Sequence, residues 1–222
     1  MRSRKHTAWK KSRRFSDVHG GRMSPKVTDR IIRRAHSLKP PDPGVETPIC
    51  IEDNPSRDYY FPLSAEECVA AIRSLPKGDH RDITHLWLRR PSGSDRRQGL
   101  PLAQFICGSG VRLIVLYPWR CDGRIDFGRL GPIKSTVRWY ERFGAELRRE
   151  KGRWFFELRE AELRRLYIHL LYHEVGHHVD WYRTHWSKAN RKQAEEAAEQ
   201  YAFHYTRTGI RVLKRLDEND DI

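Results

Sequence analysis

The sequence reads LLYHEVGHHV at residues 170–179, inside a longer segment, from about Glu160 to Tyr182, whose apolar residues recur with helical periodicity. The apolar residues of this segment are Leu163, Leu166, Ile168, Leu170, Leu171, Val175, Val179 and Trp181. Only a narrow strip stays polar, and it consists of Arg165, His169, Tyr172, Gly176 and Asp180. A helix with so little polar surface is expected to be buried on most of its sides. We therefore expect this helix to organise the fold around it.

The His-Glu-x-x-His pattern within this helix predicts a metal site. His173 and His177 lie about 40° apart around the helix axis, so both imidazoles can reach one tetrahedral Zn²⁺. Glu174 lies about 60° beyond His177, on the ligand side but offset from the metal, where a carboxylate can take a proton from water. The alternative is a pair of core histidines, but burying two imidazoles without partners is costly. Gly176 costs a helix roughly 1 kcal/mol relative to alanine, which is reasonable if another backbone or a ligand approaches there.

A zinc site of this kind needs a third protein ligand, and a second predicted helix at residues 189–208 offers three glutamates. The apolar stripe of that helix consists of Ala194, Ala198, Tyr201, Ala202 and Tyr205. Glu195 lies at the inner edge of the stripe, Glu199 lies about 40° farther out on the same side, and Glu196 points away. We expect Glu195 to be the third ligand and Glu199 to accept the free ring N–H of a ligating histidine.

The residues alone leave alternatives open. The glutamates could instead form a solvated acidic face with ordinary ion pairs to Lys192 or Arg207. His169, one turn before the motif, and His185, in the loop after it, could replace Glu195 as a ligand. His178 points about 140° away from the first histidine, so we expect it to be a packing or surface residue.

The two segments together resemble a known family. Residues 173–177, followed eighteen residues later by a Glu-x-x-Ala-x-x-aromatic-Ala segment at 195–202, resemble the gluzincin metallopeptidases. Among these, the similarity is greatest to the minimal bacterial members of the ImmA/IrrE type. The resemblance covers about residues 160–208 and implies that Glu195 is the third zinc ligand and that Glu174 is the general base.

The sequence also departs from that family in several places. Residues 1–150 have no counterpart in the resemblance, and Glu199 stands where those relatives usually carry Asn or Asp. Asp180 and Arg183 stand where the metzincin motif would require a Gly and a third His. The resemblance assigns no residue to stabilise an oxyanion. The candidates by residue type are His185, Tyr201, His204 and Tyr205, of which His204 faces away from the third ligand.

The positive charge of the chain is concentrated at its start. Residues 1–40 contain thirteen Lys and Arg against two Asp, so they carry +11 of the formal net charge of +14 of the 222 residues. This basic arm has few large aliphatic residues and ends in a Pro- and Gly-rich junction, so we expect it to be flexible. It could bind nucleic-acid phosphates, with Trp9 and Phe15 stacking on bases. The alternative is a solubilising tail, and residues 41–222 are expected to form a single domain.

The part of the chain before the long helix predicts a small sheet. We expect a helix from Leu63 to Pro76, with Ser64 as N-cap and Glu67 as its capping-box partner. Strands are expected at residues 83–88, 103–107 and 111–116, a short helix at 135–143, and an edge strand or connecting segment at 154–156. A Gly-Ser-Gly turn joins the second and third strands. This order indicates an α+β fold, with a small, mostly antiparallel sheet in the first half and a helical, zincin-like second half.

The apolar runs of the sequence are too short for a membrane-spanning helix. The most apolar run, Leu113 to Tyr117, is bounded by Arg112 and Pro118, so we expect no membrane-spanning helix. No apolar segment follows the basic start that could serve as part of a secretory signal. The cysteines are Cys50, Cys68, Cys107 and Cys121. They are widely spaced without a C-x-x-C pair, so we expect reduced thiols in a cytoplasmic protein.

Two functions of different classes agree with these residues. The first is a zinc-dependent peptidase acting on a protein or peptide substrate, with Zn²⁺ held by His173, His177 and Glu195 and with Glu174 as general base. An edge strand from the first half could then hold an extended peptide. The second is a catalytically weak or inactive zincin-like regulatory module whose basic arm binds nucleic acid. A self-processing enzyme that cuts its own arm is a third interpretation.

Overall fold

The structure, a computed structural model, describes residues 18–19, 22–23, 38–91, 102–108, 110–183 and 190–220. Most of the basic arm expected at residues 1–40 lies outside the described residues. Within the arm, Val18–His19 (β1) pairs with Arg22–Met23 (β2) as a short antiparallel ladder.

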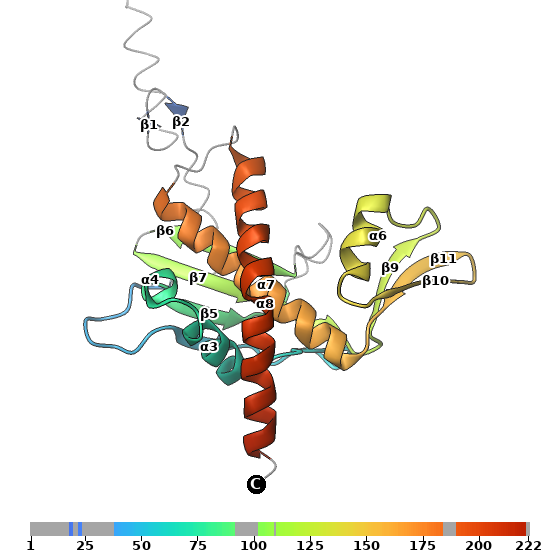
Figure 1. Ribbon diagram of the computed structural model, residues 1–222, viewed down its shortest axis with the longest axis horizontal. Coiled ribbons are helices and arrows are strands. Elements are labelled where there is room, and N and C mark those ends of the chain that lie inside the picture. The colour runs from blue at the N-terminus through green and yellow to red at the C-terminus, as the bar shows by residue number, and fades with distance from the viewer. Residues whose placement is uncertain are drawn as a thin grey trace, which may run out of the picture.

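A mixed four-stranded sheet lies at the centre of the domain (Figure 1). Its strands are, in spatial order, β3 (Ile49–Glu52), β5 (His85–Leu88), β7 (Val111–Leu116) and β6 (Ala103–Gly108). The first three strands are parallel to one another, whereas β6 pairs with β7 antiparallel, with Phe105 opposite Ile114. The expected hairpin is therefore confirmed, and β6 is an edge strand of this sheet.

Two smaller antiparallel sheets flank the central one. One joins β4 (Tyr59–Tyr60) to β8 (Trp119–Arg120). The other has the order β10 (Glu146–Glu150), β11 (Arg153–Glu157), β9 (Arg124–Gly128). The segment expected at 154–156 as an edge strand or a connection is instead part of the middle strand of this sheet. The sequence did not indicate this, because both neighbouring strands come from parts of the chain without a strong strand pattern.

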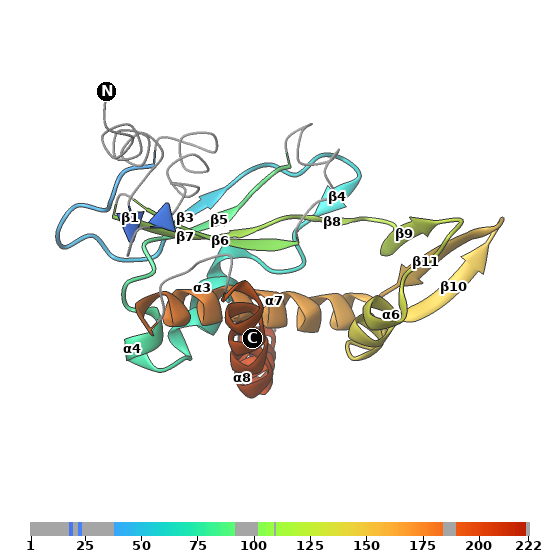
Figure 2. The ribbon, with the colours of Figure 1, turned by 90° about the horizontal axis from the view of Figure 1, so that it is seen from above.

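Four helices lie on one side of the central sheet (Figure 2): α3 (Ala65–Arg73), α4 (Lys77–His80), α7 (Glu160–Arg183) and α8 (Arg191–Asp220). The helix α6 (Lys134–Glu141) lies instead beside the sheet of β9, β10 and β11 (Figure 1). The two long helices, α7 and α8, cross each other (Figure 1). The α+β class, with a sheet in the first half and helices in the second, is confirmed.

Helix α3 begins as its sequence predicts. The Ser64 hydroxyl accepts a hydrogen bond from the Glu67 backbone N–H at 3.1 Å, and the Glu67 carboxylate accepts one from the Ser64 N–H at 2.8 Å. This capping box satisfies two N–H groups that the first turn leaves without helical partners. The helix then buries Cys68, Ala71 and Ile72 in the main core, between the sheet and the helices.

Helix α7 is buried along most of its length, but not everywhere as its sequence pattern predicts. Its apolar residues Leu163, Leu166 and Leu171 are at most 1% exposed, in the main core. The middle of the strip expected to stay polar is covered as well, because α8 packs over it and buries His169 and Tyr172, whereas Arg165 stays exposed. Trp181, expected on the buried side, is instead 38% exposed. The end of α7 thus extends beyond the core.

Helix α8 continues beyond the predicted end at residue 208 and reaches Asp220. Gly209, which is a poor helix former, lies directly against α7. Packing against another helix therefore outweighs the local preference of this glycine to end the helix.

The four cysteines carry free thiols, as expected; Cys68 and Cys107 are buried, and Cys50 and Cys121 are exposed. Among the described residues, every helix is too short or too polar to cross a lipid bilayer.

Candidate metal centre

Two glycines set the distance between α7 and α8. A Cβ atom added at Gly176 would lie 2.8 Å from Cα of Ala198 and 3.1 Å from Cβ of Tyr201. A Cβ atom added at Gly209 would lie 2.7 Å from the hydroxyl oxygen of Tyr172. All three separations are shorter than an ordinary contact between carbon atoms, which is about 3.5–4.0 Å. The close approach expected at Gly176 is therefore made by the backbone of α8.

This crossing brings the three predicted ligands together. Nε2 of His173 lies 3.4 Å from Oε2 of Glu195, and Nε2 of His177 lies 3.7 Å from the same oxygen. The two imidazole rings are nearly perpendicular, with centroids 4.7 Å apart. One ligand atom of each residue lies within 4.8 Å of the others. His177 is buried and Glu195 is exposed, so the group opens to solvent on the side of α8.

These separations fit a tetrahedral zinc ion. Zinc lies about 2.0–2.2 Å from its nitrogen and oxygen ligands, so two ligand atoms on a tetrahedron are about 3.4 Å apart. The separations of 3.4 and 3.7 Å between the imidazole nitrogens and Glu195 are close to that value. Two imidazoles and one carboxylate are also a donor set that zinc takes in proteins, and three protein ligands leave a position for water or substrate.

Glu199 connects the ligand group to side chains farther along the two helices. Its Oε2 lies 3.4 Å from Nδ1 of His173 and 3.2 Å from Nε2 of His169, and its Oε1 lies 3.6 Å from Nη1 of Arg142. Nδ1 of His169 lies 3.2 Å from Oγ1 of Thr206. Since Glu199 faces Nδ1 of His173, it can accept that N–H and leave Nε2, which faces Glu195, as the ligand atom. The structure thus places Glu199 where the helical spacing puts it.

The carboxylates change the proton affinity of the first histidine. Burial alone would lower the pKa of His173, but hydrogen bonds to Glu195 and Glu199 outweigh burial and raise this pKa to about 9. Hydrogen bonds to His173 and His177 hold the pKa of Glu195 well below its usual range. Burial would raise the pKa of Glu199, but contacts with His169 and His173 lower it to about 2. In the metal-free protein these carboxylates therefore keep a proton on His173, at the position where a cation would bind.

Glu174 lies between the ligand group and the sheet. Its side chain is buried, and burial raises the pKa of its carboxyl. The imidazoles of His173 and His177 oppose this rise, as does a hydrogen bond that the backbone N–H of Phe105 donates to the carboxylate. Because Phe105 belongs to β6, the carboxylate touches the edge strand of the central sheet. A raised pKa suits a group that accepts and then returns a proton near neutral pH.

The other histidines considered as ligands lie elsewhere. His169 contacts Glu199 and Thr206 and is not one of the three grouped ligands. His185 lies outside the described residues. His178 is 1% exposed and packs edge-on against Phe105 at a centroid distance of 5.6 Å, which confirms it as a packing residue.

Three of the candidates for an oxyanion donor, Tyr201, His204 and Tyr205, lie within the described residues. The Tyr201 hydroxyl donates to Oδ2 of Asp79 on α4 at 2.9 Å, so that hydroxyl is already engaged. His204 is exposed and packs against Tyr205. The alternative in which the glutamates form ordinary surface ion pairs applies to Glu196, which lies 3.6 Å from the Lys192 amine.

Several residues around the site have no signal in the sequence. Arg142 on the α6 side, Thr206 on α8, Phe105 on β6 and Asp79 on α4 each contact a residue of the predicted constellation. They come from four elements far apart in the chain, so spacing within one helix could not reveal them. For Thr206, its place about two turns further along the face of Glu199 was the one available indication.

The chain was compared with protein-family models, with curated proteins and with solved structures, and none of the three comparisons found a match.

Proposed function

We propose that this protein is a zinc-dependent metallopeptidase of the gluzincin type. The observation that carries the proposal is that the Nε2 atoms of His173 and His177 lie 3.4 and 3.7 Å from one oxygen of Glu195, although that glutamate is on a different helix. Such separations match the edges of a zinc tetrahedron. The buried carboxylate of Glu174 beside this group supports hydrolysis rather than a purely structural metal.

Each residue then has a defined task. His173, His177 and Glu195 would hold the ion, and Glu199 would fix the His173 ring by accepting its Nδ1–H. Bound zinc would supply a Lewis acid that polarises the scissile carbonyl and acidifies water. The Glu174 carboxylate accepts the proton from the attacking water and delivers it to the nitrogen of the leaving amine. A raised pKa helps the Glu174 carboxylate to accept the proton before it is passed on.

The edge strand β6 supports a peptide substrate. Its residue Phe105 touches Glu174 through the backbone, so a chain running along this edge passes beside the proton acceptor. An extended peptide can pair with such an edge by backbone hydrogen bonds that do not depend on its side chains. This arrangement supports a protein or peptide as the substrate class. The free thiols of the exposed cysteines support a reducing compartment, the cytoplasm, for the enzyme.

The test measures metal content and hydrolysis on the same set of variants. The wild type is expected to hold one zinc ion per chain, and Glu195→Ala is expected to hold none. Glu174→Gln should retain zinc and lose cleavage of a fluorogenic peptide library by at least about a hundredfold, since proton transfer contributes about 10²–10⁴ in rate. Glu196→Ala, which removes an exposed glutamate one position from the ligand, is the matched control and should keep both properties.

Two outcomes would contradict the proposal. A wild type that binds no zinc from a zinc-saturated buffer would remove the metal centre. A wild type that holds zinc but cleaves no member of the library at a rate above Glu174→Gln would favour the regulatory module instead. In that case single-stranded oligonucleotide binding by the basic arm should weaken with salt, with a log–log slope of several units.

A further inference from the structure

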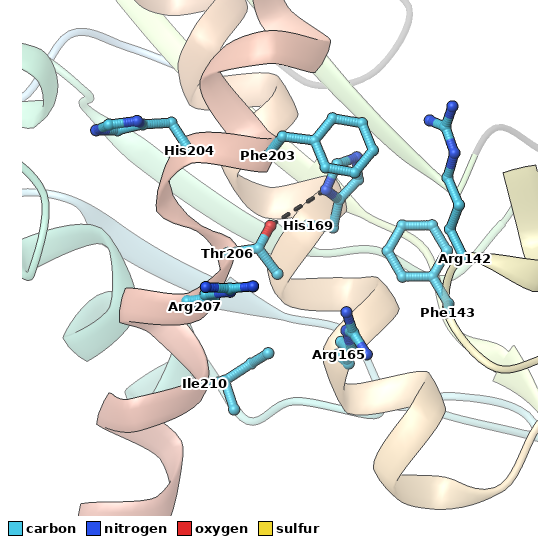
Figure 3. A pocket seen from close by; sticks show the side chains of 9 residues that line it. All are labelled: Arg142, Phe143, Arg165, His169, Phe203, His204, Thr206, Arg207 and Ile210. Atoms are coloured by element: carbon cyan, nitrogen blue, oxygen red, sulfur yellow. Dashed lines mark hydrogen bonds between the residues drawn. The ribbon is translucent and has the colours of Figure 1, made fainter.

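A pocket of about 330 Å³ lies beside the proposed metal centre, where the end of α6 meets α7 and α8 (Figure 3). Its lining includes three arginines, Arg142, Arg165 and Arg207, and three rings, those of Phe143, His169 and Phe203. Each of the three arginines comes from a different part of the fold: the end of α6, α7 and α8. The pocket is therefore formed by the tertiary structure and not by one basic segment.

The positive charge of this pocket is poorly compensated. Arg165 and Arg207 are exposed and have no ion pair with any carboxylate among the described residues. By contrast, Arg164, the neighbour of Arg165 on α7, pairs with Glu67 and with Asp217. Exposed arginines that line one pocket without carboxylate partners leave positive potential there, which favours the binding of an anion.

The pocket also offers flat apolar surface. The His169 ring lies between the two phenylalanines, with centroids 5.0 Å from Phe143 and 4.8 Å from Phe203. Phe203 is 45% exposed, which is unusual for a large apolar side chain, and the Arg142 guanidinium lies 5.1 Å from its ring centre. In the view of Figure 3, the Arg165 and Arg207 guanidinium groups lie below these rings, and that of Arg142 lies beside the Phe203 ring.

We propose that this pocket binds a small organic phosphate that carries an aromatic ring, of the mononucleotide class. The phosphate would lie between Arg165 and Arg207, because guanidinium groups donate paired hydrogen bonds to phosphate oxygens. The ring would stack on Phe203 and contact Phe143, as bases do on exposed aromatic side chains. The volume of about 330 Å³ is at the small end of ligand pockets, which favours a mononucleotide over a larger cofactor.

Glu199 links this pocket to the proposed metal centre. One of its oxygens faces Arg142 and the other faces both His169 and His173. An anion bound between Arg165 and Arg207 would add negative potential near the cation, and a bound cation would add positive potential near the anion. The ligand and zinc should therefore each increase the affinity for the other, by the same factor. This coupling rests on the proposed function, whereas binding of the mononucleotide does not.

The experiment measures binding to the full chain by titration calorimetry, with adenosine monophosphate and inorganic phosphate as probes. Metal-free and zinc-loaded protein are both used. Adenosine monophosphate should bind at least about tenfold more tightly than inorganic phosphate, because stacking of one base adds about 1–3 kcal/mol. Zinc should strengthen its binding at least about fivefold, which is the lower end of typical coupling between sites.

Three variants locate the site. Arg207→Glu should weaken binding of adenosine monophosphate at least about tenfold, since it removes a charge-assisted contact and adds repulsion. Phe203→Ala should weaken it at least about fivefold and leave inorganic phosphate unaffected. Lys77→Glu makes the same change of charge as Arg207→Glu at an exposed position on α4, at the far end of the molecule from α6 (Figure 2), and should have less than about a twofold effect.

The proposal is wrong if Arg207→Glu and Lys77→Glu weaken binding equally, because attraction to the overall charge of the chain would then explain it. Equal affinities for adenosine monophosphate and inorganic phosphate would likewise overturn the mononucleotide class. Loss of the zinc effect, with mononucleotide binding and its response to Arg207→Glu intact, would refute the coupling alone. Failure of peptide hydrolysis would leave the binding results unchanged, so the two proposals fail separately.

Discussion

Replacing Gly176 by alanine tests whether the contact between α7 and α8 positions the third ligand. The added methyl carbon would lie 2.8 Å from Cα of Ala198, against an ordinary separation of about 3.5–4.0 Å. The backbone of α8 therefore has to move by about 1 Å, since a Cα atom cannot turn aside as a flexible side chain can. Glu195 lies one turn before Ala198 and would move with it.

The effect on metal binding should exceed the effect on stability. Overpacking costs about 1–3 kcal/mol, and the better helix propensity of alanine returns roughly 1 kcal/mol, so the free energy of unfolding should fall by about 0–2 kcal/mol. Metal–ligand distances tolerate only about 0.2 Å, so a shift of about 1 Å in Glu195 should lower zinc affinity at least about tenfold. Urea unfolding and competition with a chromogenic chelator measure the two quantities.

Gly78→Ala is the matched control, because Gly78 is also helical but a Cβ atom there would meet nothing within 4 Å. It should leave zinc affinity unchanged and raise the free energy of unfolding by up to about 1 kcal/mol. Equal zinc affinities for Gly176→Ala, Gly78→Ala and the wild type would refute the claim that this helix contact sets the ligand geometry.

Three further predictions concern the same framework. Glu199→Gln should reduce zinc affinity about 10–100-fold by removing the carboxylate that orients His173, whereas Glu196→Gln should change it less than about twofold in the same chelator competition. Because the pKa of His173 is raised to about 9 in the metal-free protein, zinc must displace a proton at neutral pH. The affinity for zinc should therefore rise about tenfold per pH unit up to about pH 9 and then level off. Calorimetry in buffers of different ionisation enthalpy should detect the release of close to one proton per zinc ion bound. The pairing that raises this pKa also stabilises the metal-free fold, fully below the unfolded pKa of about 6.5 and decreasingly as the pH rises through about 9. Ser64→Ala should lower the free energy of unfolding by about 1 kcal/mol in urea, since the capping box at α3 loses its hydroxyl acceptor.

The sequence is most informative where one element carries the whole signal. The spacing of His173 and His177 depends on the pitch of one helix, and the capping box at Ser64 lies within four residues. The same is true of the β6–β7 hairpin, whose strands are joined by a short turn. These features follow from local geometry, and the structure has them at the predicted positions.

Where a second element intervenes, the pattern is misleading or silent. His169 and Tyr172 belong to the polar strip of α7, yet α8 covers both, and the predicted second helix ends at residue 208, yet α8 continues through Gly209. The parallel strand β3 pairs with a strand more than thirty residues away, and its own run of four residues carries little signal. In each case, a contact between distant segments outweighs a weak local preference.

By itself, the sequence determined that two imidazoles share one face of a buried helix and that a nearby helix carries carboxylates on a suitable side, because both statements depend only on helical periodicity. Only the tertiary structure decided that Glu195 meets both imidazoles, that Glu199 serves His173 and His169 together, and that Glu174 touches the edge strand. These relations depend on how closely and at what angle two helices cross. That crossing is set by contacts of a glycine on each helix with the backbone and side chains of the other helix, which no spacing within either helix encodes.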